Sequence, residues 1–389
     1  MKLDGVRVLD LSAFLPGPHM TMMMADHGAD VIMVEPANGV GEPTRHIGYR
    51  TDDDVSVWFR NIARGKKSLK INLKDPDAKG LFLKLVETAD VMVEAFRPGV
   101  VARLGIDYDA IQQTNPRIVY CSISAFGQTG PYRDKPAHDL AIQGLAGTVD
   151  LNRGLEDGKP ALPNMPSADM AASLMALSGI MMALFSREKT GKGDYLDISM
   201  YDALLSWTPN VTGPVFAKGE APQPKVMRSF GGAGMNNIYE TSDGEFIILG
   251  GSEVKFATNL LSALGRPDLI PLASIEPGPE QEPLRAFFRE AFRARTRSQW
   301  EAFLSEVDLC WVPVRCLKDA FDDPLSVERA MALRDEAGNH HVGNPIQFKQ
   351  DPAQLNLDLP DFGEHSGVLA REAGLSEEDI TDLIDRGVI

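Results

Sequence analysis

The stretch VRVLDLSAFLPGPHMTMMMADHGADVIMV, residues 6–34, decides the fold of this chain. Residues 6–11 and 29–34 are short runs rich in branched apolar residues, which is typical of buried strands. Residues 18–27 between them have the character of a helix, and Pro18 suits its first turn. A strand, a helix and a second strand in so short a span predict a βαβ unit with two parallel strands.

The same alternation continues through the first 130 residues. We expect further strands at residues 68–73, 90–96 and 117–123. Strands that alternate with helices predict an α/β fold with a Rossmann-like, doubly wound parallel sheet. Functional loops in such sheets follow the carboxyl ends of the strands. The loops at these positions are residues 15–18, 35–36, 97–99 and 127–131.

The later part of the chain divides at a linker. Residues 1–212 form the first part of a large domain, which ends after a long apolar helix at 170–188. Residues 213–236 are rich in glycine and proline and are predicted to be a linker. Residues 237–320 begin with strand patterns and continue with helices, which predicts a smaller α+β domain. Residues 321–389 contain loops and short helices.

Composition and charge restrict the kind of protein. The chain has 389 residues, 43% hydrophobic and 24% charged, enough for two domains with their own cores. Its net charge of −16 argues against nucleic-acid or anionic-membrane partners. An odd, sparse set of three cysteines favours a reducing compartment, and no signal-peptide or membrane-span pattern is evident. We therefore expect a cytoplasmic protein, with Cys310 and Cys316 buried in an apolar stretch.

Several common cofactor motifs are missing from the sequence. No Gly-x-Gly-x-x-Gly fingerprint follows the first strand, so use of a nicotinamide or flavin is unsupported. No Walker loop, zinc-type Cys/His spacing or Gly-x-Ser-x-Gly turn occurs either.

Asp169 stands at the start of the long apolar helix, and two interpretations are open. Asp is among the best N-cap residues, because its side chain accepts hydrogen bonds from free N–H groups. The same place near the positive end of the helix dipole would also suit a carboxylate that acts as a nucleophile or base. The sequence alone favours the cap.

Three further residues are candidates for acid–base chemistry. His138 and Asp139 follow the glycine-rich turn at residues 127–131, and a histidine facing Asp169 across a substrate would make an acid/base pair. Glu253 follows a predicted strand. Each of these residues, taken singly, is more often structural.

Basic residues gather near two ends of the predicted strands. The densest cluster, residues 64–68, contains Arg64, Lys66 and Lys67. Such a cluster is usually solvated surface, but in so acidic a chain it is a candidate phosphate site. Arg97 and Arg103 flank another loop and are candidates for the same site.

Taken together, these segments resemble the class III CoA-transferase family (CaiB/BaiF type), which includes the α-methylacyl-CoA racemases. The resemblance covers nearly the whole chain and rests on many motifs in order. They are residues 6–11 with 16–18, 64–68, 93–100, 115–120, 126–131, 168–169, 189–193 and 363–365.

The resemblance implies a fold, an assembly and a set of roles. It implies a large domain built from both chain ends, with residues 321–389 completing it, and two subunits interlocked as a homodimer. It implies no metal and no redox cofactor, because CoA would be carried by the acyl-CoA thioester substrate. The match to Asp169 is the acyl-carrying nucleophile of transferases. In racemases it is one of two proton-transfer groups, and the other matches His138.

Two reactions therefore remain open. A transferase needs Asp169 to attack the thioester and form an acyl-aspartyl anhydride. A racemase needs two acid/base groups on opposite faces of the α-carbon and an enolate held by backbone N–H groups. Residues His138, Asp139, Asp169 and Glu253 resemble the racemase set, so we expect epimerisation of a 2-methylacyl-CoA, with CoA transfer as the alternative.

Overall fold

The computed structural model describes residues 1–37, 39–154 and 157–389 of the chain. These residues form two compact units. Unit 1 comprises residues 1–146, 165–207 and 321–389, and unit 2 comprises residues 147–164 and 208–320. The chain returns to unit 1 at Phe321. Residues 147–164 and the whole predicted linker, residues 213–236, group with unit 2.

Unit 1 is built on a six-stranded parallel sheet with the strand order β3-β2-β1-β4-β5-β6. This is the strand order of dinucleotide-binding Rossmann sheets, in which the order of addition of strands reverses between β1 and β4. The prediction of a parallel α/β sheet is therefore confirmed, although the sequence reading missed β6. The strands are β1 (Arg7–Leu11), β2 (Asp30–Pro36), β3 (Lys67–Ile71), β4 (Val91–Glu94), β5 (Val119–Ser124) and β6 (Asp194–Ser199).

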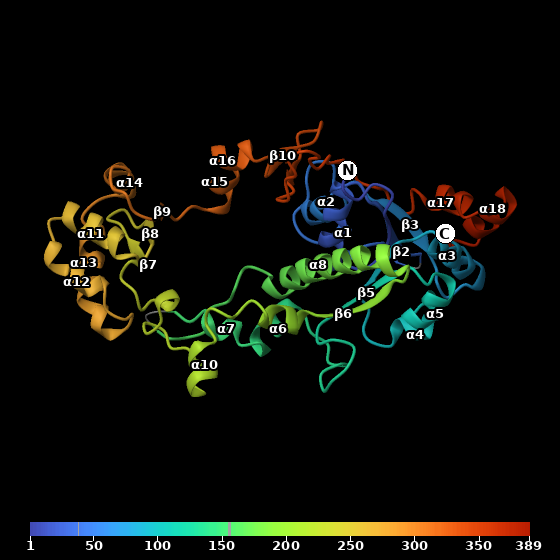
Figure 1. The fold of residues 1–389 in the computed structure, drawn as a ribbon. Coiled ribbons are helices and arrows are strands. Elements are labelled where there is room, and N and C mark those ends of the chain that lie inside the picture. Colours follow the sequence, from blue (N-terminus) through green and yellow to red (C-terminus); the bar gives the residue numbers. More distant parts are fainter. Residues whose placement is uncertain (38, 155–156) are drawn as a thin grey trace. The chain divides into compact units, whose positions relative to one another are not determined.

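Each face of this sheet is covered by helices (Figure 1). Val8 and Val31 point to one face, whereas Leu9 and Ile32 point to the other, and all four are buried. Burial on both faces explains why these strands are almost continuously apolar. The first face is covered by α1 (Pro16–Asp26), α6 (Asp139–Leu145), α8 (Ser167–Thr190) and α9 (Met200–Leu205). The second is covered by α3 (Pro76–Glu87), α5 (Tyr108–Thr114), α17 (Ser366–Glu372) and α18 (Glu377–Asp385).

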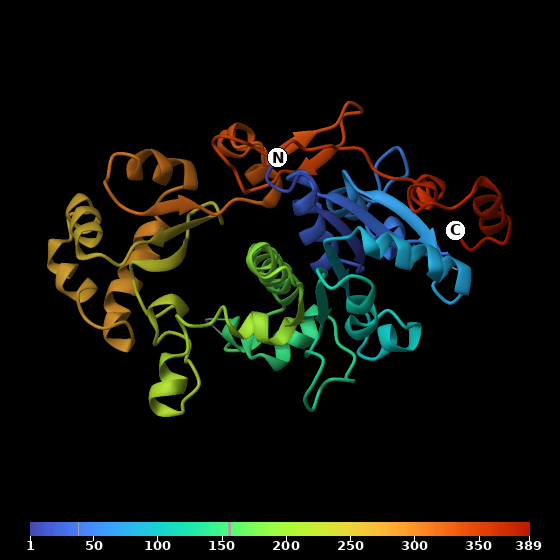
Figure 2. The ribbon, with the colours of Figure 1, turned by 45° about the vertical axis from the view of Figure 1, so that its right-hand side comes forward.

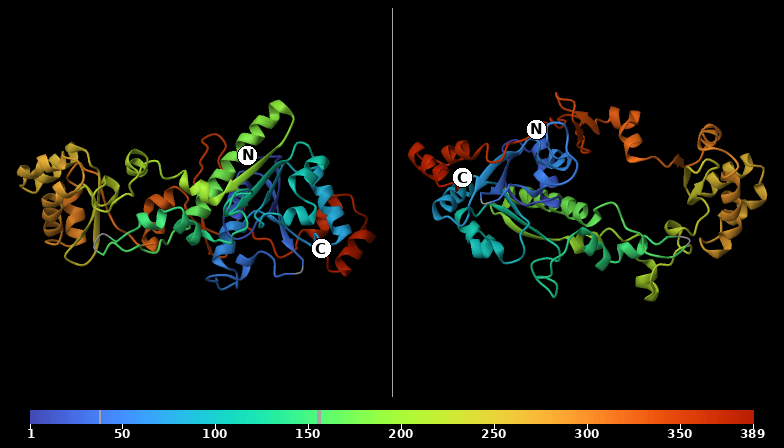
Figure 3. Two further views of the ribbon diagram at one scale, coloured as in Figure 1. Left: turned by 90° about the horizontal axis from the view of Figure 1, so that it is seen from below. Right: turned by 180° about the vertical axis from the view of Figure 1, so that it is seen from behind.

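Helix α8 is the longest helix in the described part of the chain, and Figure 3 shows it beside the sheet. It is long and apolar enough to cross a membrane by length and composition. Its alanine-rich side, with Ala171, Ala172 and Ala176 fully buried, packs into the sheet core. Small side chains allow this close packing, so α8 is a core helix in this fold.

The C-terminal segment is joined to β3 by hydrogen bonds, and both chain ends lie in unit 1 (Figure 2). The backbone N–H of His365 donates to the Ser68 carbonyl at 3.0 Å, and Lys70 N–H donates to Ser366 Oγ at 3.0 Å. The remaining elements of unit 1 are η1 (Pro43–His46), α2 (Val57–Ala63), α4 (Val100–Leu104), α16 (Pro324–Glu328), β10 (Ala332–Arg334) and β11 (His340–Val342).

Unit 2 is an α+β unit around an antiparallel sheet of β7, β8 and β9. One face of this sheet packs on helices through Tyr239, Ile247 and Leu249. The expectation of buried Cys310 and Cys316 is wrong, because both are exposed on either side of the short strand β9. The strands of unit 2 are β7 (Asn236–Glu240), β8 (Phe246–Gly250) and β9 (Trp311–Pro313). Its helices are α7 (Thr148–Leu151), α10 (Gly213–Lys218), η2 (Arg228–Phe230), α11 (Val254–Ala263), η3 (Pro267–Leu269), α12 (Ile270–Ala273), η4 (Pro279–Gln281), α13 (Glu282–Phe292) and α14 (Arg297–Leu304), while α15 (Leu317–Phe321) spans the boundary to unit 1.

Candidate active site

A large cavity of unit 1 lies at the carboxyl ends of β1, β4 and β5. Its volume is about 1010 Å³, at the upper end of the range for ligand sites. We call it the main cavity. Its wall contains His138, Asp139 and Asp169, so the structure brings together three of the four predicted catalytic residues. The loops expected to carry function at residues 15–18 and 97–99 also contribute to it.

Asp169 is the third residue of α8 and not its N-cap, which is Pro166. The N-cap interpretation favoured by the sequence is therefore wrong. Burial, followed by the nearby Asp139 carboxylate, raises the pKa of Asp169 to about 7. A carboxyl group with such a pKa is present in both protonation states near neutral pH, which suits proton transfer.

Asp139 performs the capping that the sequence had assigned to Asp169. Its Oδ1 accepts hydrogen bonds from the backbone N–H groups of Ala168 (2.8 Å) and Asp169 (3.1 Å). Its Oδ2 accepts from Gln143 Nε2 at 2.5 Å. Asp139 therefore fixes the start of α8 and supplies negative charge beside Asp169.

His138 is the N-cap residue of α6, and its side chain makes no capping hydrogen bond there. The side chain is exposed and lines the main cavity. Its ring lies edge-on to that of Phe14, with 6.1 Å between the ring centroids and 80° between the planes. The imidazole is therefore accessible to a ligand.

Glu253 belongs to unit 2. It is the N-cap residue of α11, is exposed, and makes no capping hydrogen bond with its side chain. This position in unit 2 leaves its catalytic role a prediction from the resemblance.

Arg64 and Lys66 do not form the surface phosphate cluster that the sequence suggested. Both side chains have no exposed area. Arg64 makes a bidentate ion pair with Asp26, with 3.0 and 2.8 Å between nitrogen and oxygen atoms. Lys66 Nζ donates to Asp10 Oδ2 (3.1 Å) and to Thr21 Oγ1 (2.7 Å). These are interior pairs that join β1, α1 and the segment before β3, so this expectation is corrected for both residues.

Lys67 lies at the amino end of its strand, whereas the main cavity lies at the carboxyl ends of the strands. It begins β3 and forms an ion pair with Asp30, which begins β2, at 2.8 Å. The cavity residues follow the other ends of the strands. The third member of the predicted cluster is therefore also directed away from the site.

Arg97 and Arg103 are exposed, and Arg97 lines the main cavity. Gly99 takes a left-handed conformation with φ of 84°, which favours glycine in the loop, and Arg103 Nη1 and Arg133 Nη2 lie close to it, 3.5 and 3.6 Å from where a Cβ at Gly99 would stand. The cavity wall also contains Arg133 and Lys135, which the sequence reading missed. Their position just after the predicted functional loop at residues 127–131 was the available signal.

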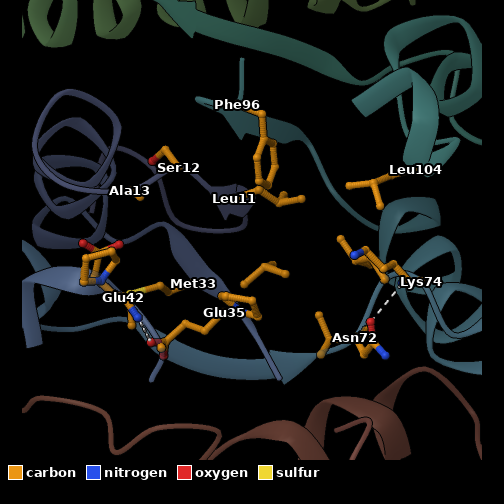
Figure 4. Close-up of a pocket in the computed structure, with 16 residues that line it drawn as sticks. Leu11, Ser12, Ala13, Met33, Glu35, Glu42, Asn72, Lys74, Phe96 and Leu104 are labelled. Atoms are coloured by element: carbon orange, nitrogen blue, oxygen red, sulfur yellow. Dashed lines mark hydrogen bonds between the residues drawn. The ribbon is translucent and has the colours of Figure 1, made fainter. Parts of the chain in front are cut away.

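A smaller pocket of about 280 Å³ adjoins the main cavity, since Ala13 and Phe96 line both (Figure 4). It lies at the carboxyl ends of β1 to β4, and its lining is mostly apolar. Figure 4 shows Lys74 and Asn72 at one side of it and Glu42 at the other. Lys74 was missed by the sequence reading, although it follows the end of β3 as closely as the expected functional loops follow theirs.

Glu94 fixes the loop that carries Phe96. It is buried at the end of β4, accepts the Phe96 N–H at 2.8 Å and accepts a short hydrogen bond from Ser122 Oγ. Burial raises the pKa of Glu94 to about 7. The segment that separates the two cavities is thus held by a buried carboxyl group.

Two hydrogen-bonding features of the main cavity bear on substrate activation. The N–H groups of the first turn of α8 are already bonded, to Met165, Asp139 and Pro166. These N–H groups are therefore not free to hold an enolate oxygen. Ser124 lines the cavity, is 8% exposed, and its Oγ has no partner among the described residues.

No group of three or more His, Cys, Asp or Glu is arranged to hold a metal ion in residues 1–37, 39–154 and 157–389.

The fold and this site define an α/β enzyme scaffold with an acid–base cavity at the carboxyl ends of its strands. The chain belongs to CoA-transferase family III, whose family model matches residues 3–366. Its relatives include an acetyl-CoA:oxalate CoA-transferase from Acetobacter aceti, 31% identical over 96% of both chains. They also include the human α-methylacyl-CoA racemase, 31% identical over 98% of this chain and 96% of the relative.

A solved structure supports the same assignment. A CaiB/BaiF family protein from Brucella suis is 28% identical and superposes with a TM-score of 0.82, covering 95% of this chain and 98% of the other. The resemblance stated from the sequence is therefore confirmed at the level of the family. Relatives with similar identity catalyse different reactions, so the family alone leaves the reaction of this chain open.

We propose that Lys74, at the wall of the smaller pocket, contacts the phosphate groups of a CoA thioester, whereas Lys67, at the other ends of the strands, does not. Replacing Lys74 with alanine should weaken binding of a CoA thioester by about tenfold, because one phosphate-directed cation at the smaller pocket is lost. The loss should shrink as ionic strength rises. Calorimetric titration with acetyl-CoA at low and high salt would measure it.

Lys67→Ala is the matched control, because it removes the same charge at the opposite edge of the sheet. We expect its affinity to stay within about twofold of the parent. Equal losses in both variants would contradict the assignment of the smaller pocket. Lys66→Ala is unsuitable as a binding test, since it would leave Asp10 buried and unpaired at a cost of about 3–5 kcal/mol.

Proposed function

We propose that this enzyme epimerises the α-carbon of a 2-methylacyl-CoA by two-base proton transfer. The observation that carries the proposal is that His138 and Asp169 line the same cavity. The pKa of Asp169 is raised to about 7, so its carboxyl group can accept or deliver a proton near neutral pH, and an imidazole is the side chain most often used for general acid–base catalysis. A reaction that needs one proton acceptor and one proton donor is the chemistry this pair supports best.

The cavity also suits the remainder of a CoA thioester. The smaller pocket has room for a flat heterocycle, and its walls are mostly apolar. Arg97, Arg133 and Lys135 line the main cavity, and Lys74 lines the smaller pocket. These cations offer partners for phosphate groups in a chain of net charge −16.

In the proposed reaction, the neutral imidazole of His138 removes the α-proton and the carboxylic acid of Asp169 delivers one to the opposite face. In the reverse direction, the Asp169 carboxylate removes the proton and the imidazolium returns one. The enolate that forms between the two transfers carries its charge on the thioester oxygen. We assign this oxygen to Ser124, a residue of the cavity wall whose buried hydroxyl has no partner among the described residues and would turn into the cavity to donate.

A second function is favoured by the acetyl-CoA:oxalate CoA-transferase among the relatives. The Asp169 carboxylate would attack the thioester carbon, the C–S bond would break, and CoA would leave as its thiolate. The CoA thiolate would attack the aspartyl carbonyl of this acyl-aspartyl anhydride, so that the donor acid leaves as its carboxylate and an aspartyl-CoA thioester forms. The acceptor carboxylate would then displace the CoA thiolate from this thioester, and the thiolate would attack the acceptor's carbonyl of the new anhydride, which gives the acceptor's CoA thioester and frees the Asp169 carboxylate. This route needs Asp169 but no second proton carrier.

Deuterium exchange separates the two functions. We expect the α-hydrogen of (2S)-2-methylacyl-CoA to exchange with solvent deuterium without any acceptor acid, because both proton carriers exchange with water. Mass spectrometry and chiral analysis of the recovered thioester would follow exchange and inversion together. CoA transfer to an added carboxylate without α-exchange, and with an acyl group trapped at Asp169 by hydroxylamine, would contradict the racemase proposal.

We also propose that two copies of the chain associate through the outer side of α8. Leu174, Met175, Met182 and Phe185 form an exposed apolar stripe there, and Met182 and Phe185 are 70% and 69% exposed. Stripes of this kind on a soluble fold mark interaction surfaces. We expect sedimentation velocity at micromolar concentration to show a dimer, and a folded monomer under these conditions would refute this part of the proposal.

A further inference from the structure

Phe14 has a strained backbone at the wall of the main cavity. It lies in the turn between β1 and α1 with φ of 67°, a conformation that bulky side chains rarely adopt. Its N–H donates to Glu42 Oε1 at 3.0 Å. Strained residues persist only when their surroundings hold them, and they cluster at functional sites.

Glu42, which holds this conformation, is itself fixed. It is 4% exposed, and its Oε1 also accepts from Thr44 N–H (3.2 Å) and Thr44 Oγ1 (3.1 Å). The Glu42 N–H donates to Glu35 Oε2 at 2.6 Å, and the guanidinium of Arg45 binds both oxygens of Glu35. The acceptor of the Phe14 N–H is therefore part of a rigid network that reaches the wall of the smaller pocket.

The strained backbone of Phe14 places its phenyl ring against the imidazole ring of His138. The two rings meet edge-on, with 6.1 Å between centroids and 80° between planes, which is a favoured aromatic geometry. His138 makes no capping hydrogen bond with its side chain. A proton carrier that must face one side of a carbon atom needs a fixed ring orientation.

We propose that Phe14 is a positioning residue that sets the orientation of the His138 imidazole in the main cavity, and that Glu42 holds Phe14 in the conformation this requires. The inference rests on the proposed function for the role of His138 in catalysis. The contact and the strain themselves are independent of which reaction the enzyme performs.

The kinetic test compares three variants of Phe14 with one control variant. Phe14→Ala should lower kcat for epimerisation on the order of tenfold to a hundredfold with KM within about twofold, since the substrate still binds while the proton carrier is misaligned. Phe14→Gly should be as slow, although glycine relieves the strained φ. Phe14→Tyr keeps the ring edge and should retain kcat within about threefold.

Phe348→Ala is the matched control. Phe348 is 39% exposed, as Phe14 is, and its ring also lies edge-on to a histidine, His27, at 5.3 Å and 80°, outside the cavity wall. It should leave kcat unchanged. The proposal would be overturned if Phe348→Ala lost as much kcat as Phe14→Ala does. Full activity in both Phe14→Ala and Phe14→Gly would also overturn it.

A spectroscopic measurement separates this inference from the proposed function. The ε1 proton of His138, assigned by its absence in His138→Ala, should shift in Phe14→Ala because the ring current of the phenyl group is lost, and should stay near its parent position in Phe14→Tyr. This result is expected even if the enzyme proves to be a CoA-transferase. An unchanged resonance in Phe14→Ala would refute the positioning role, whatever reaction is measured.

Discussion

Asp169→Asn should lose turnover by on the order of a thousandfold or more while remaining folded. Asparagine keeps the shape of the side chain, but it cannot act as a proton acceptor and donor, and it cannot form an anhydride. Both reactions considered for this enzyme require the carboxyl group, so the expectation holds for either. Steady-state rates and circular dichroism of the same preparation would test it.

The stability of this variant should depend on pH in a defined direction. The pKa of Asp169 is raised to about 7 in the folded protein, above the value near 4 expected in the unfolded chain. The folded state therefore binds this proton more tightly, and ionisation lowers the stability of the parent as pH rises from about 4 to about 7. Asparagine does not ionise. At pH 8 the variant should be more stable than the parent by on the order of 1–3 kcal/mol, and the difference should vanish near pH 4.

Asp202→Asn is the matched control for this experiment. Asp202 is the third residue of α9, as Asp169 is of α8, but it is exposed. We expect parental activity and a loss of at most about 1 kcal/mol, because a charge favourable to the helix dipole is removed. If Asp169→Asn were instead less stable than the parent at pH 8, with activity in proportion to its folded fraction, Asp169 would be a structural residue.

His138→Ala should stop epimerisation by at least about a hundredfold, because one face of the α-carbon loses its proton carrier. Asp169 remains and can still act on its own face. Exchange of the α-hydrogen should therefore continue, with retention, for the enantiomer whose hydrogen faces Asp169, and should cease for the other. Incubating each enantiomer separately in deuterated water would show this asymmetry.

His340→Ala is the control, since His340 is an exposed histidine in β11 and lies outside the main cavity. It should racemise and exchange at the parental rate. Loss of exchange for both enantiomers in His138→Ala, or undiminished epimerisation, would contradict the two-base mechanism. Retention of acceptor-dependent CoA transfer in the same variant would favour the alternative function.

The sequence predicted the sheet well because its strands are buried on both faces. Five of the six strands were expected from their apolar runs, and each matches within a few residues. The sixth, β6 (Asp194–Ser199), was missed because it lies at the edge of the sheet and its apolar residues are interrupted by Asp197 and flanked by Asp194 and Ser199. The expected loops at the carboxyl ends of β1 and β4 line the main cavity, since parallel strands bring these ends to one edge.

The sequence was less informative about charged residues. Arg64 and Lys66 look like a surface cluster along the chain, yet both are buried against Asp26 and Asp10, which lie 38 and 56 residues away. Asp139 caps α8 from 29 residues upstream of Ala168. A charge has no local pattern that reveals its partner, because the partner is brought near only by folding.

By itself, the sequence therefore determined the order of strands and helices, the family, and the residues able to carry out acid–base chemistry. These follow from local apolar periodicity and from motifs that stand in one order along the chain. The tertiary structure alone decided which of these residues share a cavity, that Asp139 and not Asp169 caps α8, and that the pKa of Asp169 lies near 7. Burial and the approach of a second carboxylate cause that pKa, and both arise only when distant segments pack together.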